Sequence, residues 1–164
     1  MAYAKDRTYL DADSHLMERP DFLRDFAVAK VRDRLAPING GDQDKNLGNW
    51  SETVANPGHS EQQVASMVAL GDSLISGPKG YLALGAFNSD ERSQALNQLG
   101  FQQQLVFATF SPLQALHGDD ISLKYGAAAA HNRAMADFCG ADKRLLGVGI
   151  LPLDDPGRAC LELD

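Results

Sequence analysis

The amino-terminal part of the chain changes its hydrophobic period twice. Residues 8–15 (TYLDADSH) alternate with period two, which predicts a strand whose Tyr, Asp and His side chains share one face. Apolar residues then repeat at helical spacing from Pro20 until Pro37, so we expect one helix there. From about residue 38 to 60 the periodicity is lost among turn-forming Asn, Gly and Pro, which predicts a long excursion of loop and short helical pieces.

The second half of the chain alternates helical and strand patterns. Helices are predicted over 60–70, 90–99, 119–139 and from residue 155 onward. Two compact apolar runs, 105–110 and 145–151, are rich in strand formers and predict strands buried on both faces. Strands that alternate with helices form parallel sheets through right-handed crossovers, so the pattern predicts an α/β fold.

The end of the sequence suggests a part of a larger fold. The last predicted helix begins near Asp155, and the sequence ends at Asp164. Three parallel strands leave exposed edges, and a closed barrel of eight βα units takes about 250 residues. We therefore expect residues 1–164 to be the N-terminal portion of a longer protein. The alternative is a small three-stranded α/β domain that is complete as it stands.

Composition narrows the classes of function. Of the 164 residues, 44% are apolar and 23% charged, which suits a folded domain, and no apolar run is long enough to span a membrane. A net charge of −7 repels phosphate backbones, which argues against nucleic-acid binding as the main function. The first residues carry no secretory signal, and Cys139 and Cys160 have no metal or redox spacing. We expect buried thiols and a cytoplasmic protein.

The candidate chemistry lies at the end of the first predicted strand. Asp13 and His15 are two residues apart, so their side chains leave the same face with the Cα atoms about 6–7 Å apart. A carboxylate oxygen and an imidazole nitrogen each bind Zn²⁺ at about 2.0–2.2 Å, so both side chains can reach one ion. Glu18 follows in the expected strand-to-helix loop. Spacing alone leaves another reading open, in which Asp13 caps a turn and His15 is a hydrogen-bonded residue at the strand end.

The remaining histidines and two arginines carry weaker signals. His59 lies in a turn-rich segment and is expected to be solvated. His117 follows the second predicted strand and can face the site, although a structural role is the simpler reading. His131 lies on a helix away from the strand ends, which favours a structural role. Arg133 and Arg144 can bind a substrate carboxylate, but one surface salt bridge each is the simpler expectation.

Six segments together carry a family resemblance, listed by sequence as LDADSHLMERP (10–20), ALNQLGF (95–101), QLVFATF (104–110), AHNR (130–133), ADFC (136–139) and RLLGVGILPLDDP (144–156). They resemble the first strand, a helix with the second strand, and the next helix and strand of the amidohydrolase-related family. That family includes aminocarboxymuconate semialdehyde decarboxylase and resorcylate-type decarboxylases, and its first strand often carries D-x-D-x-H-x-x-E or H-x-H. The resemblance covers nearly the whole chain, and residues 38–77 are the least typical part.

The resemblance implies the N-terminal part of a (β/α)8 TIM barrel, residues 1–164, with one divalent metal ion. Asp13 and His15 occupy the positions of the family's first-strand metal pair, and Glu18, the glutamate of the signature, is the catalytic candidate. Zinc is the first expectation, and the carboxylate of Asp13 makes Mn²⁺ or Mg²⁺ plausible beside it. The family's other ligands lie on later strands, so this chain alone is expected to bind metal poorly and to be inactive.

Two classes of function follow. The first is a metal-dependent hydrolase or carboxy-lyase (decarboxylase) that acts on a small carbonyl or aromatic acid, forms a homo-oligomer, and binds neither nucleic acid nor membrane. The second is a non-catalytic α/β module that associates with a partner through its open sheet edge or its helix faces.

Overall fold

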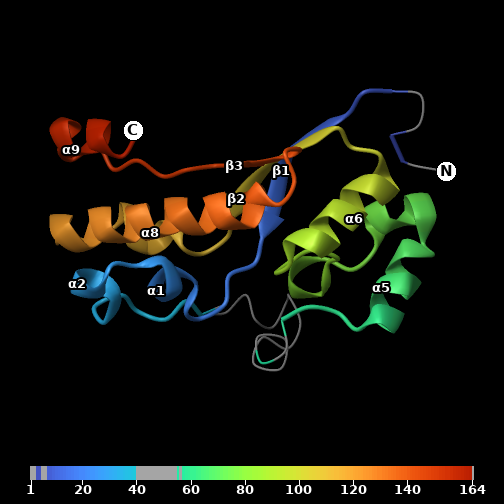
Figure 1. Ribbon diagram of the computed structural model, residues 1–164, viewed down its shortest axis with the longest axis horizontal. Coiled ribbons are helices and arrows are strands. Elements are labelled where there is room, and N and C mark those ends of the chain that lie inside the picture. The colour runs from blue at the N-terminus through green and yellow to red at the C-terminus, as the bar shows by residue number, and fades with distance from the viewer. Residues whose placement is uncertain (1–2, 5–6, 40–54, 56, 164) are drawn as a thin grey trace.

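The chain folds into a mixed α/β arrangement in which helices pack against a small sheet (Figure 1). The computed structural model describes residues 3–4, 7–39, 55 and 57–163. Its elements run in the order β1 (Leu10–Leu16), α1 (Phe22–Phe26), α2 (Ala29–Arg32), α5 (Glu61–Val68), the 3₁₀ turns η2 (Gly71–Ser76) and η3 (Gly80–Leu82), α6 (Ser89–Leu99), β2 (Gln103–Ala108), α7 (Pro112–Leu116), α8 (Ile121–Gly140), β3 (Leu145–Gly147) and α9 (Pro156–Leu161). Most of the predicted excursion, residues 40–54 and 56, lies outside the described residues.

The sheet confirms the prediction of parallel strands. Its order is β1-β2-β3, with Leu16 opposite Ala108 and Leu105 opposite Leu146. β2 is therefore central, and β1 and β3 are edge strands within the part of the chain that the structure describes.

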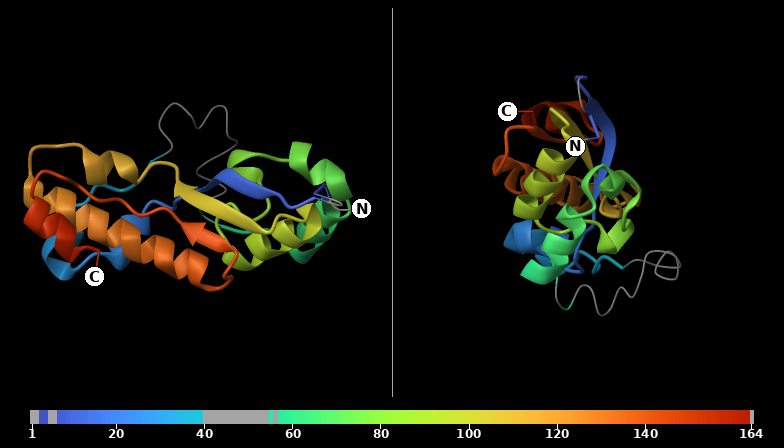
Figure 2. Two further views of the ribbon diagram at one scale, coloured as in Figure 1. Left: turned by 90° about the horizontal axis from the view of Figure 1, so that it is seen from above. Right: turned by 90° about the vertical axis from the view of Figure 1, so that its right-hand side faces the viewer.

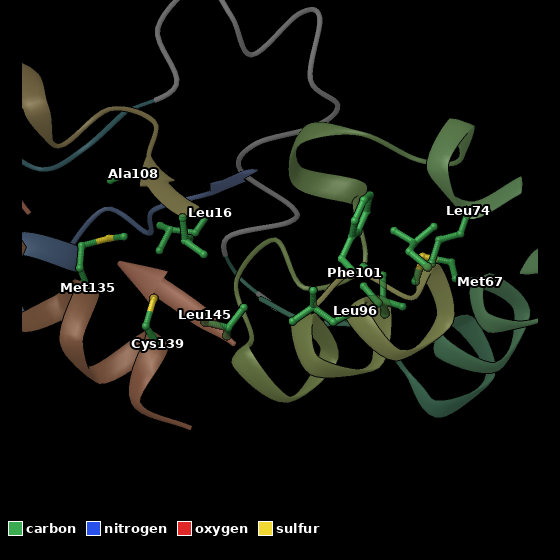
Figure 3. Packing of buried hydrophobic residues seen from close by; sticks show 13 residues of the cluster. Leu16, Met67, Leu74, Leu96, Phe101, Ala108, Met135, Cys139 and Leu145 are labelled. Carbon is green, nitrogen blue, oxygen red and sulfur yellow. The ribbon is translucent and has the colours of Figure 1, made fainter. Parts of the chain in front are cut away.

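Helices cover one face of this sheet and leave the other open. Leu16, Val106 and Leu145 are buried on the covered face, in a cluster that also holds Leu96 and Phe101 (Figure 3). On the opposite face Leu105 is 39% exposed and Leu146 is 41% exposed. The expectation that both strands are buried on both faces is therefore wrong for the described residues, because none of them covers the second face.

A second cluster packs α1 and α2 against α8. Leu23, Ala27 and Val31 meet the alanine-rich part of α8 there. A Cβ atom on Gly126 of α8 would lie 2.8 Å from a Val31 methyl carbon, so glycine allows α2 its close approach. Figures 1 and 2 show α1 and α2 beside α8, with the chain after β3 running back along α8 to α9.

The predicted single helix between Pro20 and Pro37 is wrong, because the chain breaks between α1 and α2. Ala27 takes an extended conformation with ψ 143. The carbonyls freed by the break are bound by side chains: Arg133 Nε donates to Phe26 O at 2.9 Å, and an Arg32 Nη atom donates to Ala27 O at 3.1 Å. These bonds replace helical ones, so apolar periodicity alone did not reveal the break.

The other helix predictions are confirmed by their caps. Ser60 forms a capping box with Gln63 at the start of α5, and Asp120 and Asp155 cap α8 and α9. Gly100 ends α6 with φ 77, in the left-handed region that favours glycine. By contrast α7 was not expected, and β3 ends at residue 147 rather than 151.

Two expectations about composition meet different outcomes. Cys139 is buried as expected, but Cys160 is exposed on α9, so the prediction of two buried thiols is wrong for the second. None of the helices in the described ranges combines the length and the apolar character needed to cross a membrane.

Candidate metal-binding site on the open face of the sheet

Asp13 and His15 converge on the open face of β1. Ser14, between them in sequence, is buried on the covered face, so its two neighbours point the other way. Asp13 Oδ1 lies 3.4 Å from His15 Nε2, and the two side chains are 91% and 43% exposed. The structure thus brings together the two residues that the sequence singled out and leaves them accessible.

Asp11 does not share this face, contrary to the expected alternation along residues 8–15. The pairing of β1 with β2 shifts between Asp11 and Ser14, which marks a bulge. Asp11 therefore lies opposite Gln104, whose side chain is buried, and Gln104 Nε2 donates to Asp11 Oδ2 at 3.0 Å. The bulge separates the two aspartates of the DAD sequence onto different faces.

Residues of β2 and the loop after it hold the ring of His15. The imidazole stacks on Phe107 with ring centroids 5.6 Å apart, and His15 and Phe107 are paired in the sheet register. Nδ1 of the ring lies 3.4 Å from Thr109 Oγ1, and the same hydroxyl lies 2.7 Å from the Leu16 carbonyl oxygen. The ring is therefore contacted on one face and at both nitrogens.

Arg92 of α6 supports the same stretch of β1 from the covered face. Its guanidinium donates to Ser14 Oγ, to the His15 carbonyl at 2.6 Å and to the Gly85 carbonyl at 2.9 Å. Burial lowers the pKa of Arg92 to about 10, with a partial offset from the negative charge of Asp11. The group stays charged at neutral pH, so α6 anchors the backbone of His15 with a buried cation.

The sequence did not single out Arg92, Phe107 or Thr109. Arg92 stands in a polar helix segment, where most arginines face solvent. Thr109 lay inside the predicted strand 105–110, whereas β2 ends at Ala108, so its place at the strand end came only from the structure.

Glu18 is placed away from the open face, in a buried position beyond the end of β1. Its Oε1 accepts hydrogen bonds from the backbone N–H groups of Phe110 and Ser111, both at 2.7 Å. No partner within the described part of the chain reaches Oε2. Burial raises the pKa of Glu18, and the hydrogen bonds from Ser111 and Phe110 act against it. In this arrangement Glu18 ties the end of β1 to the start of α7.

His131 extends this buried network to the residue that directly follows β3. Ser111 Oγ lies 2.8 Å from His131 Nδ1, and His131 Nε2 lies 3.1 Å from the Val148 carbonyl. A carbonyl oxygen can only accept, so Nε2 carries the hydrogen and Ser111 donates to Nδ1. Burial lowers the pKa of His131, which keeps the ring neutral. The structural role expected for His131 is confirmed.

The raised pKa of Glu18 predicts a pH effect on stability. The native state binds the proton more tightly than the unfolded state, so this contribution is complete below about pH 4.5 and is lost as pH rises through the native pKa. Relative to Glu18→Gln, which cannot titrate, the wild type should gain unfolding free energy as pH falls from 7 to 4.5. Urea unfolding of both proteins over this range measures the difference. A difference independent of pH contradicts the prediction.

The other histidines and the two arginines do not join the pair. His59 is not solvated as expected: its Nδ1 lies 2.8 Å from Glu91 Oε2, and its side chain is only 11% exposed. His117 is exposed at the end of α7. Arg144 forms the expected salt bridge, with Asp142 at 2.6 Å, whereas Arg133 binds a backbone carbonyl instead.

The donor set fits a divalent metal ion in part. Two atoms bound at about 2.0–2.2 Å to a tetrahedral ion lie about 3.4 Å apart, because the angle between them is close to 109°. Asp13 Oδ1 and His15 Nε2 show this spacing. However, the described residues contain no group of three or more His, Cys, Asp or Glu that could hold an ion. Asp13 and His15 thus provide two candidate donor atoms, and a tight site needs at least one more.

A hollow of about 260 Å³ adjoins the pair. Asp13, His15, Arg92 and Gln104 are among its lining residues, together with apolar side chains of segment 74–84 and α6. A larger apolar hollow of about 430 Å³ lies between α5 and residues 78–82, but neither Asp13 nor His15 lines it. Of these two hollows only the smaller one touches the pair, and most of its lining belongs to the covered side of the sheet.

Comparison with known proteins shows a shared fold. No family model and no curated protein matches this chain. Among solved structures, it is similar to an amidohydrolase from Mycobacterium avium subsp. paratuberculosis K-10, with a TM-score of 0.62 and 19% sequence identity. The match covers 98% of this chain and 47% of that one, so this chain spans about half the length of its neighbour. At this identity the likeness supports an amidohydrolase-like fold and says nothing about decarboxylation or substrate.

Proposed function

We propose that this chain supplies the first-strand ligands of a metal-dependent hydrolase of the amidohydrolase-related family. The observation that carries the proposal is the 3.4 Å approach of Asp13 Oδ1 and His15 Nε2 on the open sheet face. Two exposed donor atoms at the spacing of neighbouring metal ligands can supply half of the ligands of a metal site. Zinc is the first candidate for the ion, and Mn²⁺ or Mg²⁺ suit the carboxylate.

We propose in addition that residues 1–164 form the N-terminal portion of a single (β/α)8 barrel domain. The parallel strands, the exposed Leu105 and Leu146 on one sheet face, and the likeness to half of an amidohydrolase support this reading. In such a barrel the open face would line the interior, and later strands would bring further ligands. Glu18 then has the role of holding the loops after β1 and β2, from its buried place under the strand ends.

A bound divalent metal would lower the pKa of a coordinated water toward 7, which serves hydrolysis of a small carbonyl substrate. Decarboxylation of a small aromatic acid is the other chemistry open to the same pair, since an ion can also bind a carboxylate. Incubation of the metal-loaded protein with lactones and with hydroxybenzoates separates the two. Ring opening of a lactone supports hydrolysis, and release of CO₂ from a hydroxybenzoate supports the carboxy-lyase.

Metal binding by the pair can be measured even when it is weak. In a titration with Mn²⁺, paramagnetic broadening should be strongest for the amide signals of Asp13, His15 and Phe107. Asp13→Asn and His15→Gln should each weaken the apparent affinity at least about tenfold, because one of two ligands is lost. Two-dimensional amide NMR spectra follow the broadening residue by residue.

The matched control is Asp33→Asn, which removes one negative charge from an exposed position at the end of α2. It should leave the broadening around His15 unchanged. If Asp13→Asn behaves like Asp33→Asn, or if the broadening centres on another part of the chain, the proposed metal pair is wrong.

The second candidate function is association through the sheet. Its support is the pair of edge strands and the exposed Leu10, Leu105 and Leu146 around the open face. A second copy of the chain, or another partner, could cover these side chains without any metal. Sedimentation of the metal-free chain tests this: a tight dimer favours association, and a stable monomer counts against it.

A further inference from the structure

Thr109 lies where its hydroxyl can determine which ring nitrogen of His15 carries the hydrogen. It directly follows β2, and its hydroxyl oxygen lies 3.4 Å from His15 Nδ1 and 2.7 Å from the Leu16 carbonyl oxygen. Phe107, two residues earlier, stacks on the same imidazole. One strand end therefore restrains both the plane of the ring and one of its nitrogens.

The chemistry of the three groups decides where the hydrogen atoms lie. A carbonyl oxygen can only accept, so at 2.7 Å the hydroxyl of Thr109 donates its hydrogen to Leu16. The hydroxyl oxygen then presents lone pairs to His15 Nδ1, and the favourable partner for a lone pair is an N–H group. Nδ1 therefore carries the hydrogen of the neutral ring, and Nε2 is left with its lone pair toward Asp13.

Asp13 favours the other tautomer of His15, because its carboxylate could accept a hydrogen bond from an Nε2–H group. That carboxylate is 91% exposed and is well hydrated, so a contact at 3.4 Å gives it little advantage over water. The Thr109 hydroxyl is less exposed and is already oriented by its bond to Leu16. Because the Thr109 hydroxyl is already oriented, it loses less conformational entropy when it accepts a hydrogen bond. This favours the tautomer with the hydrogen on Nδ1.

We propose that Thr109 is a positioning residue that fixes the neutral ring of His15 in the Nδ1–H tautomer and so keeps Nε2 available as a ligand. A metal-binding histidine commonly donates its other N–H to a nearby acceptor, and the acceptor sets both tautomer and ring orientation. The link to metal binding rests on the proposed function, whereas the tautomer itself does not.

The tautomer can be measured directly in the metal-free protein. Long-range ¹H–¹⁵N spectra of ¹⁵N-histidine-labelled protein at pH 8.5 distinguish the two neutral forms, and His15→Gln identifies the signals of His15. The wild type should show the Nδ1–H pattern. Thr109→Val keeps the shape without the hydroxyl and should move the signals toward the Nε2–H form, and Thr109→Ser should restore the wild-type pattern. An Nε2–H pattern in the wild type, or no change in Thr109→Val, overturns the proposal.

A Mn²⁺ titration of the same variants separates this proposal from the proposed function. Thr109→Val should bind Mn²⁺ about tenfold more weakly than the wild type, and Thr109→Ser should bind it as the wild type does. If the tautomer follows Thr109 while the wild type shows no Mn²⁺ effect near His15, the metal function fails and the positioning role stands. If Mn²⁺ broadens the His15 region equally in all three proteins, Thr109 does not position the ligand.

Discussion

Gly85→Ala should lower the unfolding free energy by about 3 kcal/mol or more, the sum of a conformational cost and a steric one. Gly85 has φ +79, a region that alanine enters only at a cost of about 1–2 kcal/mol. A Cβ atom there would also lie 2.5 Å from Arg92 Cα and 2.6 Å from Arg92 N. These are backbone atoms of α6, which cannot turn aside as a flexible side chain can.

The local hydrogen bonds prevent an easy escape from this clash. The Gly85 N–H donates to Glu91 Oε2 at 3.2 Å, and the Gly85 carbonyl accepts from Arg92 Nε at 2.9 Å. Any shift of residue 85 away from α6 lengthens both bonds. We therefore expect the clash to be relieved by loss of these contacts rather than by a small local adjustment.

Gly118→Ala is the matched control for this effect. Gly118 also has positive φ, +101, but a Cβ atom there would meet nothing within 4 Å. Gly118→Ala should lower the unfolding free energy only by the conformational cost, about 1–2 kcal/mol. Urea unfolding of the two variants and the wild type gives the comparison. Equal losses in both variants would show that the close approach of Gly85 to Arg92 is unimportant.

Local sequence signals predicted the helices whose ends are defined by their own residues. The capping box of Ser60 and Gln63, the caps Asp120 and Asp155, and the closing Gly100 all act within a few residues of themselves. Such signals need no knowledge of distant packing. The alternation of helices and strands likewise predicted the parallel sheet.

The features that the sequence analysis predicted wrongly depend on contacts between residues far apart along the chain. The break after α1 is stabilised in part by Arg133, 107 residues beyond Phe26, and His59 is buried against Glu91, 32 residues later. Turn-rich sequence around His59 suggested solvent, since nothing in it points to a helix terminus elsewhere. These errors follow from treating each segment by its own pattern.

In the candidate site, the spacing of residues along the strand predicted one position correctly and another wrongly. The spacing of Asp13 and His15 predicted that they lie together, and their side chains do approach to 3.4 Å although the bulge lies between Asp11 and Ser14. The same spacing rule failed for Asp11, because a bulge adds one residue and reverses the face of everything before it. No local pattern in the DAD sequence indicates the bulge.

Arg92→Met should also destabilise the protein strongly, by about 3 kcal/mol, although it removes a buried charge. The lowering of the Arg92 pKa to about 10 corresponds to a net cost of about 3 kcal/mol for holding the cation in this buried position, which methionine would not incur. Against this stand three hydrogen bonds from the cation, to Ser14, His15 and Gly85, worth about 1.5–3 kcal/mol each. The bonds outweigh the burial cost.

The consequence reaches the candidate site through the backbone of β1. Without the guanidinium, the His15 carbonyl and the Ser14 hydroxyl lose their donor on the covered face, and the bulge loses its anchor. Amide hydrogen exchange should therefore quicken in β1 and its partner β2 more than in α8. Arg133→Met, which removes an exposed arginine with a single backbone acceptor, should cost less than about 1 kcal/mol.

The two arginine variants show whether Arg92 stabilises β1 or whether its hydrogen bonds only offset the cost of burying its charge. If Arg92→Met unfolds at the same urea concentration as the wild type, the desolvation cost cancels the hydrogen bonds and α6 does not hold the strand. If it loses stability but exchange rises equally throughout the chain, the arginine supports the core in general. Only a loss concentrated in β1 and β2 identifies Arg92 as the residue that holds the strand of Asp13 and His15 in place.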